Sequence, residues 1–299
     1  MVARTENGVV RSAAHAPLPR GTVDGESLPE PRRGGGPAGE KVSLVVPARN
    51  EARNIGWVLE RLPSSIDEVV VVDGHSVDET VRVALAARPD VRVVAQPGLG
   101  KGDALREGFR SASGELIVMI DADGSMAPDE IPHFLHFLSR GYDVVKGSRF
   151  MIGGGSRDIT RLRRAGNGAL RGLVNHLYRV PLTDLCYGYI AFRRDALEHL
   201  DLLSTGFEVE TRLVVSALRA GLKVVEVPSV ELPRRYGESR LRAVRDGTRV
   251  LRAIVRGHEV GVSGRAVQLA RRAAGRDPLI PEPRAVGEPT PSSDPILTA

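Results

Sequence analysis

The chain has 299 residues, of which 41% are hydrophobic, so it can form one large domain or two small ones around a real core. Its formal net charge is +5, but the positive charge is uneven, because residues 234–256 hold eight arginines against two acidic residues. This excess implies an anionic partner such as nucleic acid, a membrane surface or a phosphorylated substrate, and the single Cys186 excludes an internal disulfide and a multi-thiolate zinc site.

The two ends of the chain have the composition of disordered extensions. Residues 1–40 are rich in Gly, Pro, Arg and Glu without apolar periodicity, and residues 259–299 end in a Pro-rich stretch. We find no secretory h-region and no apolar run of about 18 residues, which a membrane span would need. We therefore expect one folded domain over residues 41–258 and a cytoplasmic protein, with a peripheral position on the cytoplasmic face of the membrane as the alternative.

The first half of this domain alternates between two kinds of pattern. Apolar runs typical of buried strands occur at 42–46, 69–72, 91–94, 116–120 and 144–145, and helical patterns separate them at 51–62, 78–87, 101–112 and 128–139. The second half has helical patterns at 159–178, 208–220 and 240–256, with short strands near 190–193 and 223–227. This alternation predicts an α/β fold with a mainly parallel sheet flanked by helices.

Polar residues directly follow three of the predicted strands. They are Pro47-Ala-Arg49-Asn-Glu51, then Asp73, then Asp121-Ala-Asp123. Because the carboxyl ends of parallel strands meet at one edge of a sheet, where α/β proteins place ligands, these residues predict a nucleotide-binding edge.

The run 116–120 ends in two carboxylates separated by one residue. In an extended backbone, Asp121 and Asp123 face the same way, and such hard oxygen donors can share Mg²⁺ or Mn²⁺. The alternative is a plain turn, since Asp and Gly are common turn residues. Asp73 has two similar interpretations, because it could accept a hydrogen bond from a base or ribose, or could cap the next turn.

A glycine-rich segment, Gly98-Leu-Gly100-Lys101-Gly102, lies at the start of the helix predicted at 101–112. Flexible backbone and a cation before a helix suit a phosphate. The segment nevertheless matches neither the P-loop nor the dinucleotide-binding fingerprint, because no Ser or Thr follows the lysine and the glycine spacing differs.

Together, these motifs resemble the nucleotide-sugar half of a family 2 glycosyltransferase with the GT-A (Rossmann-like) fold. The matching segments are residues 42–51, 70–80, 100–108 and 121–124. Later segments are similar to the dolichol- or polyprenyl-phosphate mannosyltransferase branch, and these are residues 147–150, 183–188, 206–210 and 234–241. The resemblance covers about residues 41–258.

The resemblance implies a role for each matching residue. Pro47, Arg49, Glu51 and Asp73 would hold the base and ribose, and Asp121 and Asp123 would hold the metal and the diphosphate. The donor or acceptor phosphates would meet Arg149, Arg235 and Arg240. Three departures leave the donor base open: Arg49 stands where many relatives carry an aromatic residue, Gly74 replaces a frequent second Asp, and Arg240 replaces a lysine.

The implied reaction is an inverting transfer of a hexose, mannose first, from a nucleotide sugar (GDP-mannose or a UDP-hexose) to a polyprenyl phosphate. A phosphate acceptor is already ionised near neutral pH and needs no general base. A hydroxyl acceptor needs one, and Asp184 is the first candidate, followed by Glu208 and Glu210.

Three other functions compete with this interpretation. The nearest is a soluble family 2 enzyme that uses UDP-glucose or a similar donor on a small-molecule or polysaccharide hydroxyl. A nucleotide-sugar pyrophosphorylase is disfavoured because no Gly-rich loop follows the first strand. RNA binding is disfavoured because aromatic residues make up only 4% of the chain, too few for stacking platforms.

The segment after Ser239 predicts a basic amphipathic helix. Its arginines recur at steps of three and four beside an adjacent stripe of Leu241, Val244, Thr248, Leu251 and Val255. A weaker version of the pattern covers residues 161–178. Either these stripes pack into the core and the arginines are solvated, or the helices lie on an anionic membrane surface.

Overall fold

The computed structural model describes residues 39–238 and 243–257. Apart from residues 39 and 40, the extensions predicted at 1–40 and 259–299 lie outside the described residues, and so do Arg240 and the rest of residues 239–242.

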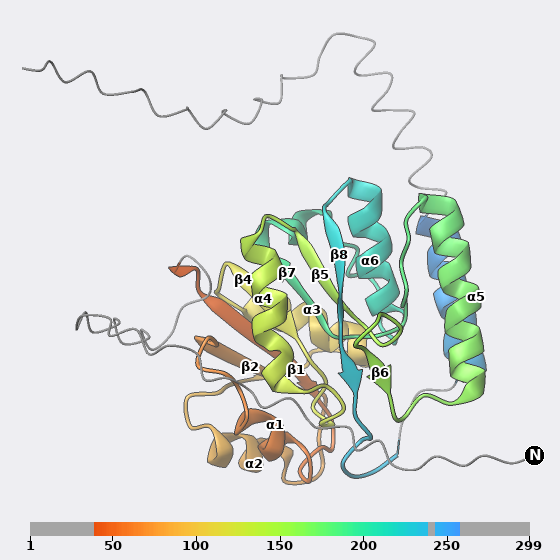
Figure 1. Cartoon of the computed structure of the whole chain (residues 1–299). Coiled ribbons are helices and arrows are strands. Elements are labelled where there is room, and N and C mark those ends of the chain that lie inside the picture. Colours follow the sequence, from red (N-terminus) through yellow and green to blue (C-terminus); the bar gives the residue numbers. More distant parts are fainter. Residues whose placement is uncertain (1–38, 239–242, 258–299) are drawn as a thin grey trace, which may run out of the picture. The chain divides into compact units, whose positions relative to one another are not determined.

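A seven-stranded sheet lies at the centre of the fold (Figure 1), in the order β3-β2-β1-β4-β7-β5-β8. All neighbouring strands pair in parallel except β7, which runs antiparallel to both β4 and β5. The strands are β1 (Val42–Ala48), β2 (Glu68–Asp73), β3 (Arg92–Ala95), β4 (Leu116–Met119), β5 (Val144–Ser148), β7 (Ile190–Arg193) and β8 (Val224–Pro228). The predicted α/β fold with a mainly parallel sheet is confirmed.

Helices cover both faces of this sheet, which explains why its strands read as continuous apolar runs. One apolar cluster contains side chains of α1 (Ile55–Leu59), α2 (Thr80–Ala87) and α4 (Ile131–Ser139). The other contains those of α3 (Lys101–Ser111), α5 (Arg161–Tyr178), α6 (Val209–Ala220) and the final helix, residues 243–257. Successive residues of β1 alternate between the two clusters, as strand geometry requires.

The strand register brings four strand ends to one edge of the sheet. Ala48 at the end of β1 pairs with Asp73, which in turn pairs with Ala95 at the end of β3. On the other side of β1, Val45 pairs with Met119 at the end of β4. The chain order reverses at β1, so this edge is a switch point of the kind where α/β sheets bind ligands.

The helix predicted at 51–62 is wrong in its extent, because α1 includes only Ile55–Leu59. The backbone N–H groups of Glu51 and Ala52 donate instead to the side chains of Thr80 and Asp78. These long-range partners hold the segment in a turn. The structure also contains short elements that the patterns did not predict, namely a parallel pair of β6 (Gly155–Ser156) with β9 (Val230–Glu231) and a 3-10 helix at Arg194–His199.

The final helix packs on a face that the predicted stripe does not contain. Val250, Ala253 and Ile254 are buried against the second cluster. The stripe residues Val244, Leu251 and Val255 are 73%, 43% and 43% exposed. The interpretation in which this stripe packs into the core is therefore wrong for these three residues. Within the described residues, no helix combines the length and apolarity that crossing a bilayer requires.

Candidate active site

The main cavity lies at the carboxyl edge of β1, β2 and β4, with α3 and α6 on its other side. Six of the predicted site residues line it: Pro47, Arg49, Glu51, Lys101, Asp121 and Asp123. The sequence interpretation gave no role to Gln96, Arg163, Phe207, Glu231 or Arg234, which also line it, and named Glu210, another lining residue, only as a base candidate behind Asp184. None of these residues stands directly beside Asp121 and Asp123 in the sequence, so the strand-end signal could not find them.

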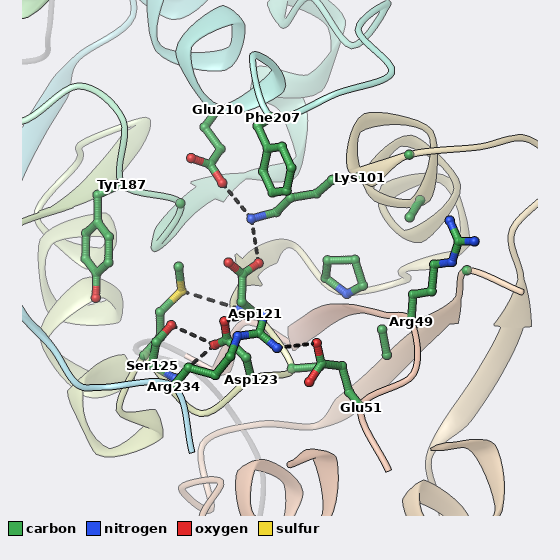
Figure 2. A pocket seen from close by; sticks show the side chains of 18 of the residues that line it. Arg49, Glu51, Lys101, Asp121, Asp123, Ser125, Tyr187, Phe207, Glu210 and Arg234 are labelled. Carbon is green, nitrogen blue, oxygen red and sulfur yellow. Dashed lines mark hydrogen bonds and ion pairs between the residues drawn. The ribbon is translucent and has the colours of Figure 1, made fainter. Parts of the chain in front are cut away.

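Asp121 is held by Lys101, which also reaches Glu210 on α6 (Figure 2). The Lys101 Nζ lies 2.5 Å from Asp121 Oδ1 and 2.6 Å from Glu210 Oε1. Burial raises the pKa of Asp121 to about 6, against the opposing effect of Lys101 and with a further rise from Asp123. Burial would lower the pKa of Lys101, but its two carboxylate partners raise it, so the lysine stays charged. Lys101 therefore bridges two carboxylates that are 89 residues apart in the chain.

The glycines beside Lys101 have a packing role. A Cβ at Gly100 or Gly102 would come within 2.1 Å of the carbonyl oxygen of Thr205 or Ser204. The N–H of Gly102 donates to Thr205 O at 3.0 Å. The two glycines thus let the start of α3 approach the segment before α6, which brings Lys101 to Glu210. The predicted phosphate contact of Lys101 stays a prediction.

Asp123 is held from two sides. Its Oδ1 accepts from the backbone N–H of Ser125 at 2.9 Å and from the Ser125 hydroxyl at 2.7 Å. Its Oδ2 lies 3.0 Å from Arg234 Nη2, and Arg234 Nη1 reaches Glu51 Oε1 at 2.7 Å. Arg234 is therefore the arginine of this segment whose guanidinium reaches the cavity carboxylates, and the phosphate contact predicted for Arg235 stays a prediction.

Arg235, to which the resemblance assigned a phosphate contact, does not direct its guanidinium at the Asp123 carboxylate. Its guanidinium lies over the ring of Trp57, 4.6 Å from the centroid, and it is exposed. Neighbouring side chains of a non-helical segment project in different directions. Arg234 therefore faces the cavity, while Arg235, one position further along, lies on the surface.

The charges of the cavity suit a divalent cation. Six acidic side chains line it against four basic ones, an excess of two negative charges. Asp121 and Asp123 supply hard carboxylate oxygens of the kind that Mg²⁺ and Mn²⁺ prefer. No group of three or more His, Cys, Asp or Glu side chains arranged to hold a metal occurs in the described part of the chain. The donor set thus fits an ion whose remaining ligands come from a diphosphate or water.

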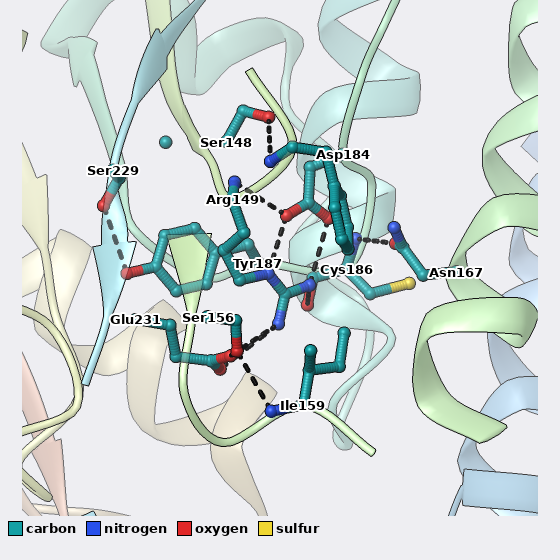
Figure 3. A network of polar contacts seen from close by, with 12 residues as sticks. Ser148, Arg149, Ser156, Ile159, Asn167, Asp184, Cys186, Tyr187, Ser229 and Glu231 are labelled. Atoms are coloured by element: carbon teal, nitrogen blue, oxygen red, sulfur yellow. Dashed lines mark hydrogen bonds and ion pairs between the residues drawn. The ribbon is translucent and has the colours of Figure 1, made fainter. Parts of the chain in front are cut away.

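Arg149 and Asp184 lie in a buried polar network beside the cavity (Figure 3). The Arg149 guanidinium contacts Asp184 at 2.7 and 3.0 Å and Glu231 at 3.2 Å. Arg149 is only 4% exposed and Asp184 is fully buried. Burial acts to raise the pKa of Asp184, but Lys146 and Arg149 outweigh it, so this pKa lies below its ordinary value.

This network does not bring Asp184 to the cavity as the prediction of a general base requires. Its carboxylate is directed at Arg149, and it is absent from the described lining, whereas Glu210 is present there. Asp73 also lies off that lining, and its carboxylate accepts the N–H of Ser76 at 3.3 and 3.4 Å, as its turn-capping alternative requires. Arg240 lies outside the described residues.

A second, mostly apolar groove opens beside the main cavity. It has a volume of about 350 Å³ and runs between α5 and the final helix. It shares Arg163, Cys186, Phe207 and Glu210 with the main cavity. Its apolar lining is contributed by Ile159, Leu162, Ala169, Leu170, Val244, Val250 and Leu251.

Comparisons with known proteins agree with this arrangement. The family model "Glycosyl transferase family 2" matches residues 43–201. Glycosyltransferase AglJ of Haloferax volcanii is 33% identical over 71% of this chain and 70% of its own length. Polyprenol monophosphomannose synthase of Mycolicibacterium smegmatis is 30% identical over 76% of this chain and 89% of its own length.

Solved structures show the same fold. Glucosyl-3-phosphoglycerate synthase from Mycobacterium tuberculosis, in complex with Mn²⁺, UDP and its product, superposes with a TM-score of 0.60. The match covers 74% of this chain and 81% of that one at 23% identity. At this identity the likeness establishes the fold alone.

Proposed function

Because this chain belongs to glycosyltransferase family 2 and has the GT-A fold, we propose that it transfers a hexose from a nucleotide sugar to a polyprenyl phosphate. The observation that supports a polyprenyl-phosphate acceptor is the apolar groove, which meets the charged cavity at Glu210 and Phe207. An isoprenoid chain in the groove would bring its phosphate to the cavity where the donor sits. The names of curated relatives, among them polyprenol monophosphomannose synthase, support the same acceptor.

In this proposal the donor lies along the strand edge, with its diphosphate at Asp121 and Asp123. A bound Mg²⁺ or Mn²⁺ would neutralise the charge that develops on the leaving diphosphate. Lys101 and Arg234 stand beside these two carboxylates and add positive charge at the same place. The acceptor phosphate is already ionised near neutral pH, so the fully engaged Asp184 is not needed as a base.

The position of Glu210 favours a second candidate function, transfer to a hydroxyl of a water-soluble acceptor. Its carboxylate lines both cavities and lies 2.6 Å from Lys101, where it could take a proton from an acceptor.

One experiment distinguishes the two candidate functions. Labelled GDP-mannose, UDP-glucose and other nucleotide sugars are offered with polyprenyl phosphate and the product is extracted into organic solvent. Label that stays in the aqueous phase on an added soluble acceptor would contradict the lipid acceptor.

Filling the groove is expected to block the lipid acceptor. Gly166 on α5 lines the groove, and a Cβ there would meet nothing within 4 Å. Gly166→Leu should lower kcat/KM for polyprenyl phosphate by about 10- to 100-fold, because the leucine side chain removes the room in the groove for two or three methylene groups of the lipid. The affinity for nucleoside diphosphate should not change.

Gly172→Leu is the matched control. Gly172 lies on the same helix with equally free space, but it does not line the groove. Both variants gain helix propensity of up to about 1 kcal/mol, so neither should lose thermal stability. Equal acceptor kinetics in the two variants would exclude the groove as the acceptor site.

The exposed arginines of the final helix are expected to bind an anionic bilayer. Arg245, Arg252 and Arg256 are exposed on the helix that carries the exposed Val244, Leu251 and Val255. Each arginine near such a surface contributes about 1 kcal/mol, and salt screens the attraction over about 8 Å. Changing all three to Gln should release the protein from phosphatidylserine vesicles in a sedimentation assay.

The control for this test changes three exposed arginines on other elements, Arg82, Arg110 and Arg140, to Gln. Their loss removes the same net charge and should leave most of the vesicle binding in place. If wild type ignores anionic vesicles at low salt, the membrane surface is not a partner.

A further inference from the structure

Gln96 is a buried polar residue of the main cavity with no role in the mechanism above. It directly follows β3, is 4% exposed and lines the cavity next to Gly74. Its backbone N–H donates to Asp73 O at 2.9 Å, which ties it to the end of β2. A buried amide in a ligand cavity is costly unless both of its ends find partners.

The hydrogen bonds of Gln96 fix which way its amide faces. The Nε2 donates to Gly100 O at 2.8 Å and to Asp103 Oδ2 at 3.2 Å. Both neighbours are acceptors only, so the NH₂ group must face them and the Oε1 must face away. In the part of the chain that the structure describes, no donor reaches this Oε1.

Asp103 is itself firmly held. It is 5% exposed, accepts the N–H of Gly98 at 2.7 Å and pairs with Arg106. A rotation of the Gln96 amide would bring its oxygen against the Asp103 carboxylate and the Gly100 carbonyl. The orientation is therefore locked by repulsion as well as by hydrogen bonds.

The absence of a side chain at Gly74 leaves the Oε1 accessible. A Cβ at Gly74 would lie 2.9 Å from Gln96 Oε1 and 3.2 Å from Arg49 Cβ. Gln96, Gly74 and Arg49 thus meet in the main cavity beyond the ends of β1, β2 and β3, and none of the three lines the apolar groove. There a donor with its diphosphate at Asp121 and Asp123 would place its nucleobase.

We propose that Gln96 reads the nucleobase of the donor and, because its amide cannot turn, selects guanine over uracil. Guanine presents two adjacent N–H donors, N1–H and the 2-amino group. The single N–H of uracil can also donate to the Oε1, but it lies between two carbonyl oxygens, which a fixed acceptor repels, whereas guanine has a second donor in place of one of them. Asp103 is a positioning residue that keeps the acceptor turned toward the base. This inference rests on the proposed function, since it assigns the base of that nucleotide sugar.

Calorimetric titration with GDP and UDP in the presence of Mn²⁺ tests the inference without any acceptor. Wild type should bind GDP at least about tenfold more tightly than UDP, because GDP gains a buried hydrogen bond where UDP leaves a polar group unpaired. Gln96→Met should lose about tenfold in GDP affinity and should keep or gain UDP affinity, because the oxygen that repels the uracil carbonyls is gone, so the preference falls. A wild type that prefers UDP, or an unchanged ratio in Gln96→Met, would overturn the proposal.

Asp103→Asn tests the positioning role. An Asn side chain can donate to a turned Gln96, so only the Gly100 carbonyl still opposes the turn that would bring the Gln96 NH₂ to the base. The GDP preference should fall below that of wild type, while thermal melting still shows a folded protein. Asp90→Asn, at an exposed aspartate paired with Arg88, is the matched control and should keep the wild-type ratio. Retention of the full preference in Asp103→Asn would refute the locking role.

The proposed function and the base inference fail in different ways. If wild type binds neither nucleotide, the nucleotide-sugar function itself is wrong. If wild type binds both and transfers sugar to polyprenyl phosphate, but the ratio does not depend on Gln96, only the base inference is wrong.

Discussion

Asp123→Ala is expected to lower the rate of glycosyl transfer by at least about 100-fold, the loss typical of removing one stabiliser of transition-state charge. The change removes one of the two carboxylates proposed to hold the divalent ion. It also leaves Arg234 with Glu51 as its remaining carboxylate partner. Initial rates with labelled donor and saturating Mn²⁺ measure the effect, and electron paramagnetic resonance of Mn²⁺ with nucleoside diphosphate measures ion binding directly.

Asp129→Ala is the control for this prediction. Asp129 lies six residues further along the chain, is exposed and does not line the cavity, so its loss should leave transfer near the wild-type rate. Wild type should lose activity in excess chelator and recover it on addition of Mg²⁺ or Mn²⁺. Full turnover in chelator would contradict the proposed metal requirement.

Arg149→Met is expected to destabilise the protein by about 3–5 kcal/mol, the cost typical of breaking a buried ion pair. The methionine keeps much of the apolar stem but leaves the carboxylates of Asp184 and Glu231 without their guanidinium partner. Asp184 is fully buried, so water cannot replace the lost hydrogen bonds. Urea unfolding of wild type and variant gives the difference in unfolding free energy.

Arg110→Met breaks a surface pair in comparison. The Arg110 side chain is 78% exposed, and such pairs contribute at most about 1 kcal/mol. If Arg149→Met loses no more unfolding free energy than this control, the buried network is not a main source of stability.

The contribution of the network should also depend on pH. The pKa of Asp184 in the folded protein lies below its ordinary value of 3.8, so the folded state favours the ionised form. This stabilisation is fully present above the pKa of the unfolded chain and is lost as the pH falls through the lower folded value. The difference in unfolding free energy between wild type and Arg149→Met should therefore become smaller below about pH 3.8.

The amino-acid sequence by itself determined the sheet and one edge of the site. Strands such as β2 read as unbroken valines because both faces of a parallel sheet are covered, and this signal is local. The position of Asp121 and Asp123 within four residues of the end of β4 was equally visible, because a strand end is defined by its own residues. These features depend on side chains that are neighbours in the chain, so periodicity reveals them.

Only the tertiary structure decided which charged groups meet. Lys101 pairs with Glu210, and the guanidinium of Arg234, not that of Arg235, pairs with the Asp123 carboxylate, because loop directions bring together residues that are more than a hundred positions apart. Asp184 turned inward to Arg149, since a buried arginine requires a carboxylate partner. The final helix carried two apolar stripes, and contact with its neighbours fixed which one is buried. The sequence therefore revealed the residues able to carry the chemistry, while long-range packing and charge pairing chose among them.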